Sequence, residues 1–220
     1  MTVLALSGDR SERTRETLLT AAEELFAERG MYAVSNRQIS EKAGQRNNAA
    51  VCYHFGTRTD LLRAIETKHR TPIESHRERV LAELGDSTDL HGWVGALVRP
   101  LTDHLDELGI PSYYGRFAAQ AMADPSCREV LKKDALASPQ LVLAMNGIIR
   151  CLPDLPKRVQ FERIVMARNL LMHTCAEHEG ALAAHGPSAR SPWPLAAEGL
   201  TDAIAGLWQA PVRTRDRGKA

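Results

Sequence analysis

The sequence predicts an all-α protein, and three observations lead to this prediction. Apolar residues recur at steps of three and four through most of the 220 residues, as they do along one face of a helix. No segment alternates apolar and polar residues in the manner of a half-buried strand. The interruptions hold Gly, Pro, Asp and Ser, which end one helix and cap the next.

Composition places the chain among ordinary globular proteins. Hydrophobic residues make up 44% and charged residues 25%, and the net charge is +1, so any nucleic-acid binding must depend on local basic groups. The four cysteines lie far apart without a CxxC pair, which argues against a disulfide framework or structural zinc. The first ten residues lack the features of a secretion signal and no run is long enough to span a bilayer. We therefore expect a cytoplasmic protein without membrane contact.

The first 56 residues predict three helices in succession. The first covers residues 12–29 and ends at Gly30. Ser35 and Gln38 have the spacing of a capping box, so the second helix should run from near Asn36 to residue 43. The third should be capped by residue 47 or 48, both asparagines, and end by residues 55–56. The second and third helices form a helix-turn-helix, although a plain helical hairpin with a polar turn has the same spacing.

The third helix has the composition of a helix that enters a DNA major groove. Small side chains let its backbone approach the bases, while asparagine pairs with adenine and arginine with guanine. The residues expected to contact bases are Arg37, Arg46, Asn47, Asn48, Ala49 and Ala50. The residues expected to contact phosphates are Tyr53, His54, Thr57 and Arg15. Val51 and Phe55 should face the core of the domain.

Residues 14–65 resemble the N-terminal domain of the tetracycline-repressor (TetR) family. The resemblance lies in the stretches TRETLLTAAEELFAERGMYAVSNRQISEKAG and YHFGTRTDLLRAI. It implies an N-terminal three-helix DNA-binding domain followed by a helical domain that binds a small molecule and forms a homodimer on a palindromic operator. Such proteins usually repress transcription until the ligand binds. The turn before the third helix is one residue longer than is usual, and Arg58 stands where the family often has a phosphate-binding lysine.

The rest of the chain predicts further helices over residues 60–84, 89–108, 112–123, 126–151, 157–184 and 194–209, with kinks at Pro72, Pro100 and Pro139. We expect three parts: the DNA-binding domain 1–58, a regulatory and dimerisation domain 59–210, and a basic, disordered tail 211–220. The candidate ligand-pocket residues, for which core packing is the favoured explanation, are Trp93, Leu97, Tyr113, Phe117, Met145 and Met166. The candidate dimer-interface residues are Phe161, Arg168, Leu171, Ala196, Gly199, Leu200, Ala203 and Leu207.

Two alternatives to a ligand-released repressor remain at this point. One is an activator or a ligand-independent regulator of the same fold. The other is an enzyme built on a helical bundle, which is disfavoured because no nucleophile–base pair, phosphate loop or paired carboxylates occur at a meaningful spacing. His173 and Glu177 lie one helical turn apart but lack a third metal ligand, so we expect neither a metal nor a cofactor.

Overall fold

The computed structural model describes residues 2–212, apart from the side chains of residues 2–9, 130 and 134–136. Within this range all regular secondary structure is helical, which confirms the predicted fold class. The helices in chain order are α1 (Thr2–Arg29), α2 (Asn36–Lys42), α3 (Ala50–Phe55), α4 (Arg58–Leu84), α5 (Leu90–Leu108), α6 (Tyr114–Ala123), α7 (Pro125–Leu136), α8 (Pro139–Arg150), α9 (Lys157–His185), the short 3-10 helix η1 (Pro187–Ala189) and α10 (Trp193–Gln209).

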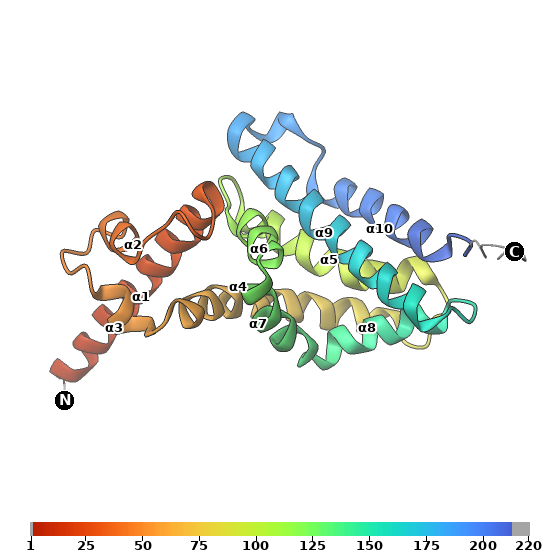
Figure 1. Ribbon diagram of the computed structural model, residues 1–220, viewed down its shortest axis with the longest axis horizontal. Helices are drawn as coiled ribbons and strands as arrows, with labels where there is room; N and C mark the ends of the chain where they lie inside the picture. The colour runs from red at the N-terminus through yellow and green to blue at the C-terminus, as the bar shows by residue number, and fades with distance from the viewer. Residues whose placement is uncertain (1, 213–220) are drawn as a thin grey trace, which may run out of the picture.

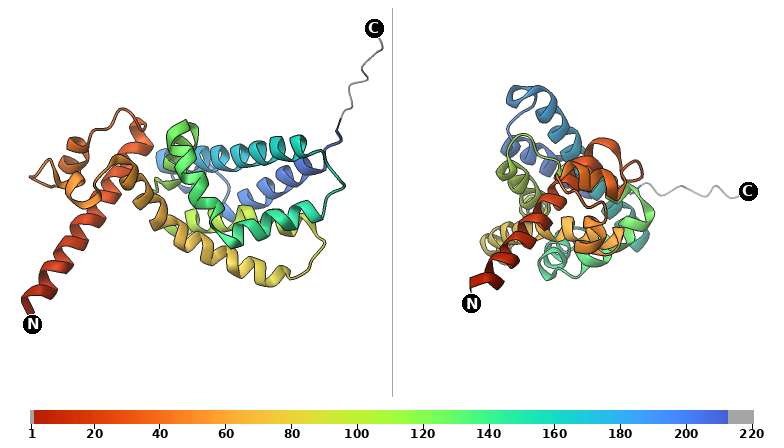
Figure 2. Two further views of the ribbon diagram at one scale, coloured as in Figure 1. Left: turned by 60° about the horizontal axis from the view of Figure 1, so that its bottom comes forward. Right: turned by 90° about the vertical axis from the view of Figure 1, so that its left-hand side faces the viewer.

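Helices α1, α2 and α3 form a small unit at one end of the molecule (Figure 1). Its core is made of fully buried side chains from each helix, among them Phe26, Ile39 and Val51. Helix α1 begins at Thr2, about three turns earlier than the predicted residue 12, and its first turns extend beyond α2 and α3 (Figure 2). The predicted start was wrong, and the sequence has no proline between residues 2 and 11 that would end a helix there.

Helix α4 leaves this unit and continues into the larger group of helices, α5 to α10 (Figure 1). There α5 packs between α4 and α10, and α6 packs against both α1 and α9. Pro72 and Pro100 lie inside unbroken α4 and α5. Among the helices that the structure describes, none is long and apolar enough to cross a membrane.

The predicted single helix over residues 126–151 is wrong, because the chain forms two helices there. Ser138 separates α7 from α8, and its hydroxyl accepts a hydrogen bond from the Leu141 amide at 3.1 Å. Pro139 occupies the first position of α8, where its missing amide hydrogen would have no helical partner in any case. A serine cap followed by proline therefore starts a new helix instead of kinking an existing one.

Candidate nucleic-acid interface

The start of α2 is fixed by the predicted capping box. The Ser35 hydroxyl accepts from the Gln38 amide at 3.3 Å, and the Gln38 side-chain oxygen accepts from the Ser35 amide at 2.8 Å. Each side chain thus satisfies a backbone donor that the first helical turn leaves without a partner. This local arrangement sets where α2 begins and how the chain enters the helix-turn-helix.

The turn between α2 and α3 spans residues 43–49 and is held from both sides. Gly44 adopts a φ of +68°, which L side chains rarely adopt. The Gln45 amide donates to the Ser40 carbonyl oxygen at 2.9 Å, and the buried Ser40 hydroxyl donates to the Asn48 carbonyl oxygen at 3.5 Å. The lengthened turn is therefore an ordered segment that presents residues 46–49 to solvent.

The predicted asparagine cap of α3 is wrong in detail. The N-cap residue is Ala49, which has no side chain that could cap the helix. The Asn47 side-chain oxygen instead accepts a hydrogen bond from the Ala49 amide at 2.9 Å. Such an Asx turn stabilises the backbone immediately before a helix, and its asparagine here lies two positions before the N-cap residue.

Helix α3 has a buried face and an exposed face. Val51 and Phe55 are buried in the domain core, as the sequence predicted. Ala50 is buried with them, so the prediction that its methyl group contacts a base is wrong. Helical geometry places residues 50, 51 and 55 on one side. The opposite side carries Ala49, Cys52 and Tyr53.

The other predicted base-contacting residues are all exposed. Arg46, Asn47, Asn48 and Ala49 follow one another along the end of the turn and the start of α3. Arg37 is also exposed, and its guanidinium forms an ion pair with Glu41 at 2.7 Å, one turn further along α2. Base recognition by Arg37 would therefore require it to exchange this carboxylate for a base edge.

A contact that the sequence did not predict joins α2 to α3. The Asn36 side-chain amide donates to the Cys52 sulfur at 3.4 Å. Asn36 was expected only as the first residue of α2, and the contact depends on how the two helices cross. No spacing rule within one helix could reveal it.

The predicted phosphate-contacting residues differ in how accessible they are. Tyr53 is 82% exposed, and the half-buried His54 ring meets it edge-on. Arg15 is half-buried with its guanidinium over the Phe55 ring. The Thr57 hydroxyl is engaged with Asp60 in the capping box that starts α4. Of these residues, Tyr53 and Thr57 are exposed, and only the Thr57 side chain is engaged in a helix cap.

Arg58 does not have the free guanidinium that a phosphate contact requires. Its side chain donates to the backbone carbonyl oxygens of Val34, at 2.9 Å, and Met31. The guanidinium also lies over the Phe26 ring, 4.7 Å from the centroid, and partial burial lowers the pKa of the group. The predicted phosphate role of Arg58 is therefore corrected: the residue fastens the segment before α2 to the start of α4.

Comparison with known proteins bears directly on this geometry. Residues 18–65 match the family model described as bacterial regulatory proteins, tetR family, and this range covers the helix-turn-helix and the start of α4. Residues 18–65 are a TetR-family DNA-binding domain. The predicted family and the predicted function as a DNA-binding transcriptional regulator are thereby confirmed. Members of this family bind DNA and are not enzymes.

Solved structures show that the likeness in fold extends over nearly the whole chain. A candidate TetR-family transcriptional regulator from Mesorhizobium loti is 16% identical, with a TM-score of 0.51 over 91% of this chain and 99% of that one. The TetR-family regulator PfmR from Thermus thermophilus is 18% identical, with a TM-score of 0.50 over 90% and 97%. At this identity the comparison concerns the fold alone. No curated protein matches the chain.

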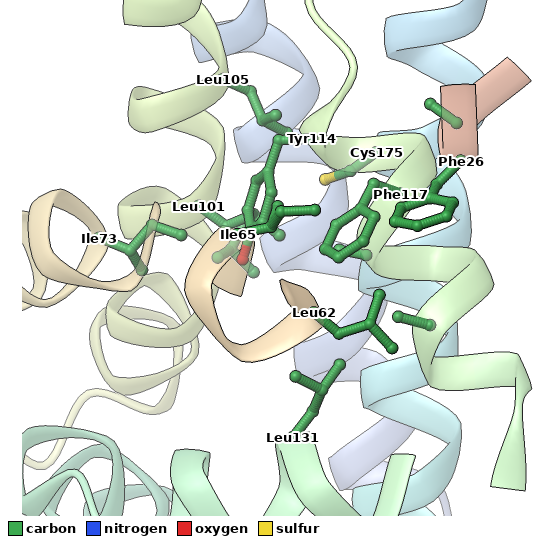
Figure 3. Close-up of a cluster of buried hydrophobic side chains, with 14 of the residues drawn as sticks. Phe26, Leu62, Ile65, Ile73, Leu101, Leu105, Tyr114, Phe117, Leu131 and Cys175 are labelled. Carbon is green, nitrogen blue, oxygen red and sulfur yellow. The ribbon is translucent and has the colours of Figure 1, made fainter. Parts of the chain in front are cut away.

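The TetR-type domain is tied to the larger helical part through α1 and α6. Phe26 of α1 stacks on Phe117 of α6, with ring centroids 6.2 Å apart (Figure 3). The Gln120 side chain donates to the Ala27 carbonyl oxygen at 3.0 Å near the end of α1. The Tyr32 hydroxyl donates to Asp124, just after α6. Through these contacts α6 packs directly against the end of α1, the helix on which α2 and α3 rest.

The six predicted pocket residues do not line one cavity in this regulator. Phe117 and Trp93 are 1% exposed and belong to the core, Phe117 against α1 and Trp93 against Gly147 of α8. Tyr113 donates to Glu24 at 3.2 Å, while Met166 is exposed on α9. Leu97 and Met145 are half-buried. Apolar composition could not separate these roles, because core filler and pocket lining use the same residues.

Two grooves formed by described residues can be compared with the predicted pocket, and each contains at most one of the six predicted residues. One lies between the end of α4, the start of α5 and α10, and its rim includes Glu83, Asp89, His91 and Asp202. The other lies where α9 begins and α10 ends. Met166 and Leu207 are among its lining residues.

The predicted dimer residues are exposed to different degrees. Phe161, Gly199 and Ala203 are exposed, and Arg168, Leu171, Ala196 and Leu207 are half-buried. Leu200 is buried, and α10 packs extensively on α5, so its assignment to the subunit interface is wrong. Ile204, four positions after Leu200, is also buried, and this spacing places both on the inward face of α10.

Proposed function

We propose that the protein is a repressor that binds a palindromic operator as a homodimer and is released by a small-molecule effector. Residues 1–58 would read the DNA, and residues 59–210 would bind the effector and the second subunit. The TetR-type domain supports the DNA-binding half of this proposal. The dimer and the effector rest on the family resemblance and on the surface of α9 and α10.

The observation that carries the DNA-reading assignment is the division of α3 into two faces. Burial of Val51 and Phe55 fixes the rotation of the helix and so directs Tyr53 outward, and the turn exposes residues 46–49 directly before the helix. We assign base contacts to Arg46, Asn47, Asn48 and Ala49, with Arg37 as a further candidate. Phosphate contacts are assigned to Tyr53, His54, Thr57 and Arg15, because hydroxyl, imidazole and guanidinium groups suit phosphate oxygens.

The proposed dimer interface lies on the outward faces of α9 and α10. Phe161 is 61% exposed and Met166 is 52% exposed, which is unusual for large apolar side chains on adjacent turns of one helix. On α10, a β-carbon added at Gly199 or Gly206 would have no described atom within 4 Å. Such small residues leave room for the helices of a second subunit to approach closely, and a two-fold axis would bring the same faces together.

Selection of bound duplexes from random DNA by the full-length protein tests the proposal. An inverted repeat whose half-site centres lie about one helical turn, or a multiple of it, apart is expected from two symmetry-related recognition helices. A single asymmetric half-site would overturn the dimeric mode of reading. Metabolites related to the genes beside the selected site should then release the DNA. If none does so while binding stays specific, a ligand-independent regulator replaces the ligand-released repressor.

A further inference from the structure

A chain of buried hydrogen bonds crosses the junction between the DNA-binding domain and the rest of the molecule. The Glu23 carboxylate of α1 lies 2.9 Å from Nε2 of His69 on α4. Nδ1 of His69 lies 2.8 Å from Nε2 of His104 on α5. None of the three side chains is more than 6% exposed. Three helices that begin in different parts of the fold are thus joined by polar groups inside an apolar environment.

Aromatic and apolar side chains shield these hydrogen bonds from water. The Tyr114 ring of α6 stacks on His69 with centroids 4.0 Å apart and an interplanar angle of 18°. Tyr114 is itself buried and also meets His104 edge-on. Figure 3 shows Tyr114 beside Phe117, with Ile65 and Leu105 nearby. The hydrogen bonds therefore lie in a region of low dielectric constant, where adding a charge is costly.

One arrangement of protons satisfies every donor in this chain of hydrogen bonds. His69 donates from Nε2 to Glu23, and its Nδ1 lone pair accepts the Nε2 hydrogen of His104. This arrangement leaves only a lone pair at His104 Nδ1, an atom that is buried without a hydrogen-bond partner among the described residues. A proton added there would create a buried N–H group with no acceptor. A neutral His104 ring is therefore the state that the closed junction favours.

The charged groups around the pair come from every helix that packs on it. Helix α1 contributes Glu23 and α5 contributes Glu107, while Tyr114 of α6 is the titratable group that covers the rings. Helix α4 contributes Glu66, Lys68, Arg70 and His76. Burial and then the neighbouring His69 lower the pKa of His104 to about 4, against the opposing effect of Glu107. The site as a whole disfavours a proton on His104.

We propose that His69 and His104 are positioning residues for DNA binding, whose hydrogen-bond chain to Glu23 holds the DNA-binding domain in place until acidification opens it. The closed junction would fix the direction in which α1 and α3 are presented. The open junction would let the domain move, so that part of the binding free energy is spent on restoring its orientation. This role of the junction depends on DNA binding by the TetR-type domain and does not depend on the proposed effector.

The sign of the pH effect follows from the pKa of His104. A ring that reaches water on opening regains its ordinary pKa of 6.5, whereas the closed ring has a pKa of about 4. The open state therefore binds more protons, and the closed state loses stability as the pH falls from 6.5 towards 4. Between pH 7.5 and 5.5 the equilibrium constant for opening should rise about tenfold.

Hydrogen–deuterium exchange of the full-length protein without DNA tests this opening directly. Exchange is corrected for the intrinsic chemical rate and compared at pH 7.5 and 5.5 for the wild type, His104→Gln and His91→Gln. The glutamine amide that replaces the His104 ring can still donate to His69 but does not titrate in this range. His91 lies on the same helix and is exposed, so its variant is a matched control.

In the wild type and His91→Gln, protection of amides in residues 18–27 and 114–120 should fall about tenfold at pH 5.5, while that of α10 should not. His104→Gln should show no such fall. Equal protection at both pH values in the wild type, or an equal fall in His104→Gln, would overturn the proposal. If His104→Gln fails to fold, the protonation of the His104 ring in the wild type is followed instead, by its ¹⁵N chemical shifts. Protonation outside the pH range of opening would then overturn the proposal.

Binding to a duplex obtained by selection from random DNA tests whether the junction governs DNA binding. The wild type and His91→Gln should lose affinity on acidification by up to about tenfold more than His104→Gln does. Any effect of His54, which lies in the proposed DNA interface, is common to all three proteins and cancels in the comparison. Identical pH profiles for all three proteins would show that the junction does not govern DNA binding, even if it opens.

Discussion

The Arg58 guanidinium donates a hydrogen bond to the backbone carbonyl oxygen of Val34 across 2.9 Å, and Met31 provides a second carbonyl acceptor. Val34 directly precedes the capping box that starts α2, and Arg58 is the first residue of α4. A side chain at the beginning of the helix that leads into the larger part thus sets the position of the segment that enters the helix-turn-helix. The orientation of the recognition unit depends on this contact.

Arg58→Ala should lower the free energy of unfolding by about 1–3 kcal/mol, because two buried carbonyl oxygens lose their donors. Arg63→Ala, an exposed arginine on the same helix, should change it by no more than about 0.5 kcal/mol. Thermal and urea unfolding measure both. The slope of log affinity for DNA against log salt should be the same for Arg58→Ala and the wild type. A slope reduced by about one unit without loss of stability would restore the phosphate role instead.

Asn48→Ala should weaken binding to the selected operator by about 1–3 kcal/mol and leave binding to unrelated duplexes nearly unchanged. The reason is that the exposed Asn48 amide lies at the start of α3, where an asparagine can form two hydrogen bonds with adenine. Fluorescence anisotropy with both duplexes measures the difference. Asn146→Ala, an exposed asparagine on α8, serves as the control. Operator affinity equal to that of this control would remove Asn48 from the base-reading set.

Ala203→Arg should convert the proposed dimer into a folded monomer that binds its operator poorly. The exposed Ala203 lies between Gly199 and Gly206 on the outward face of α10, and two arginines meeting across a two-fold axis would be buried without partners. Light scattering gives the mass and circular dichroism the helix content. Ala123→Arg, at an exposed position on α6, should leave the mass unchanged. A normal dimer with Arg at position 203 would show that the subunits meet elsewhere.

Glu179→Gln should destabilise the protein by about 2–4 kcal/mol, because one amide oxygen cannot replace two carboxylate oxygens. The Glu179 side chain is 1% exposed and accepts from the Gly115 and Arg116 amides, both at 2.9 Å, at the start of α6. Denaturant unfolding tests the loss against Glu177→Gln, an exposed glutamate on the same helix. A loss no larger than that of the control would mean that the α6 terminus has no need of this carboxylate.

Features that depend on neighbours along the chain could be predicted from the sequence. The capping box of Ser35 and Gln38, the buried side of α3 formed by Val51 and Phe55, and the end of α1 near Gly30 are all set within one or two helical turns. A cap requires only that donor and acceptor lie three residues apart, and a buried face requires only the helical period. The family resemblance over residues 14–65 added the function to this local pattern.

Features that depend on how helices meet could not be predicted, because the partners lie far apart in the chain. Arg58 matches the position of a phosphate-binding residue, yet the loop 31–34 folds back beneath it and takes its hydrogen bonds. Leu200 belongs by spacing to the predicted dimer interface, yet it is buried on α10, a helix that packs on α5. Glu23, His69 and His104 are separated by 46 and 35 residues, and only the packing of α1, α4 and α5 makes them one hydrogen-bond chain. Periodicity gives the direction of a side chain on its own helix, and tertiary packing decides what that side chain meets.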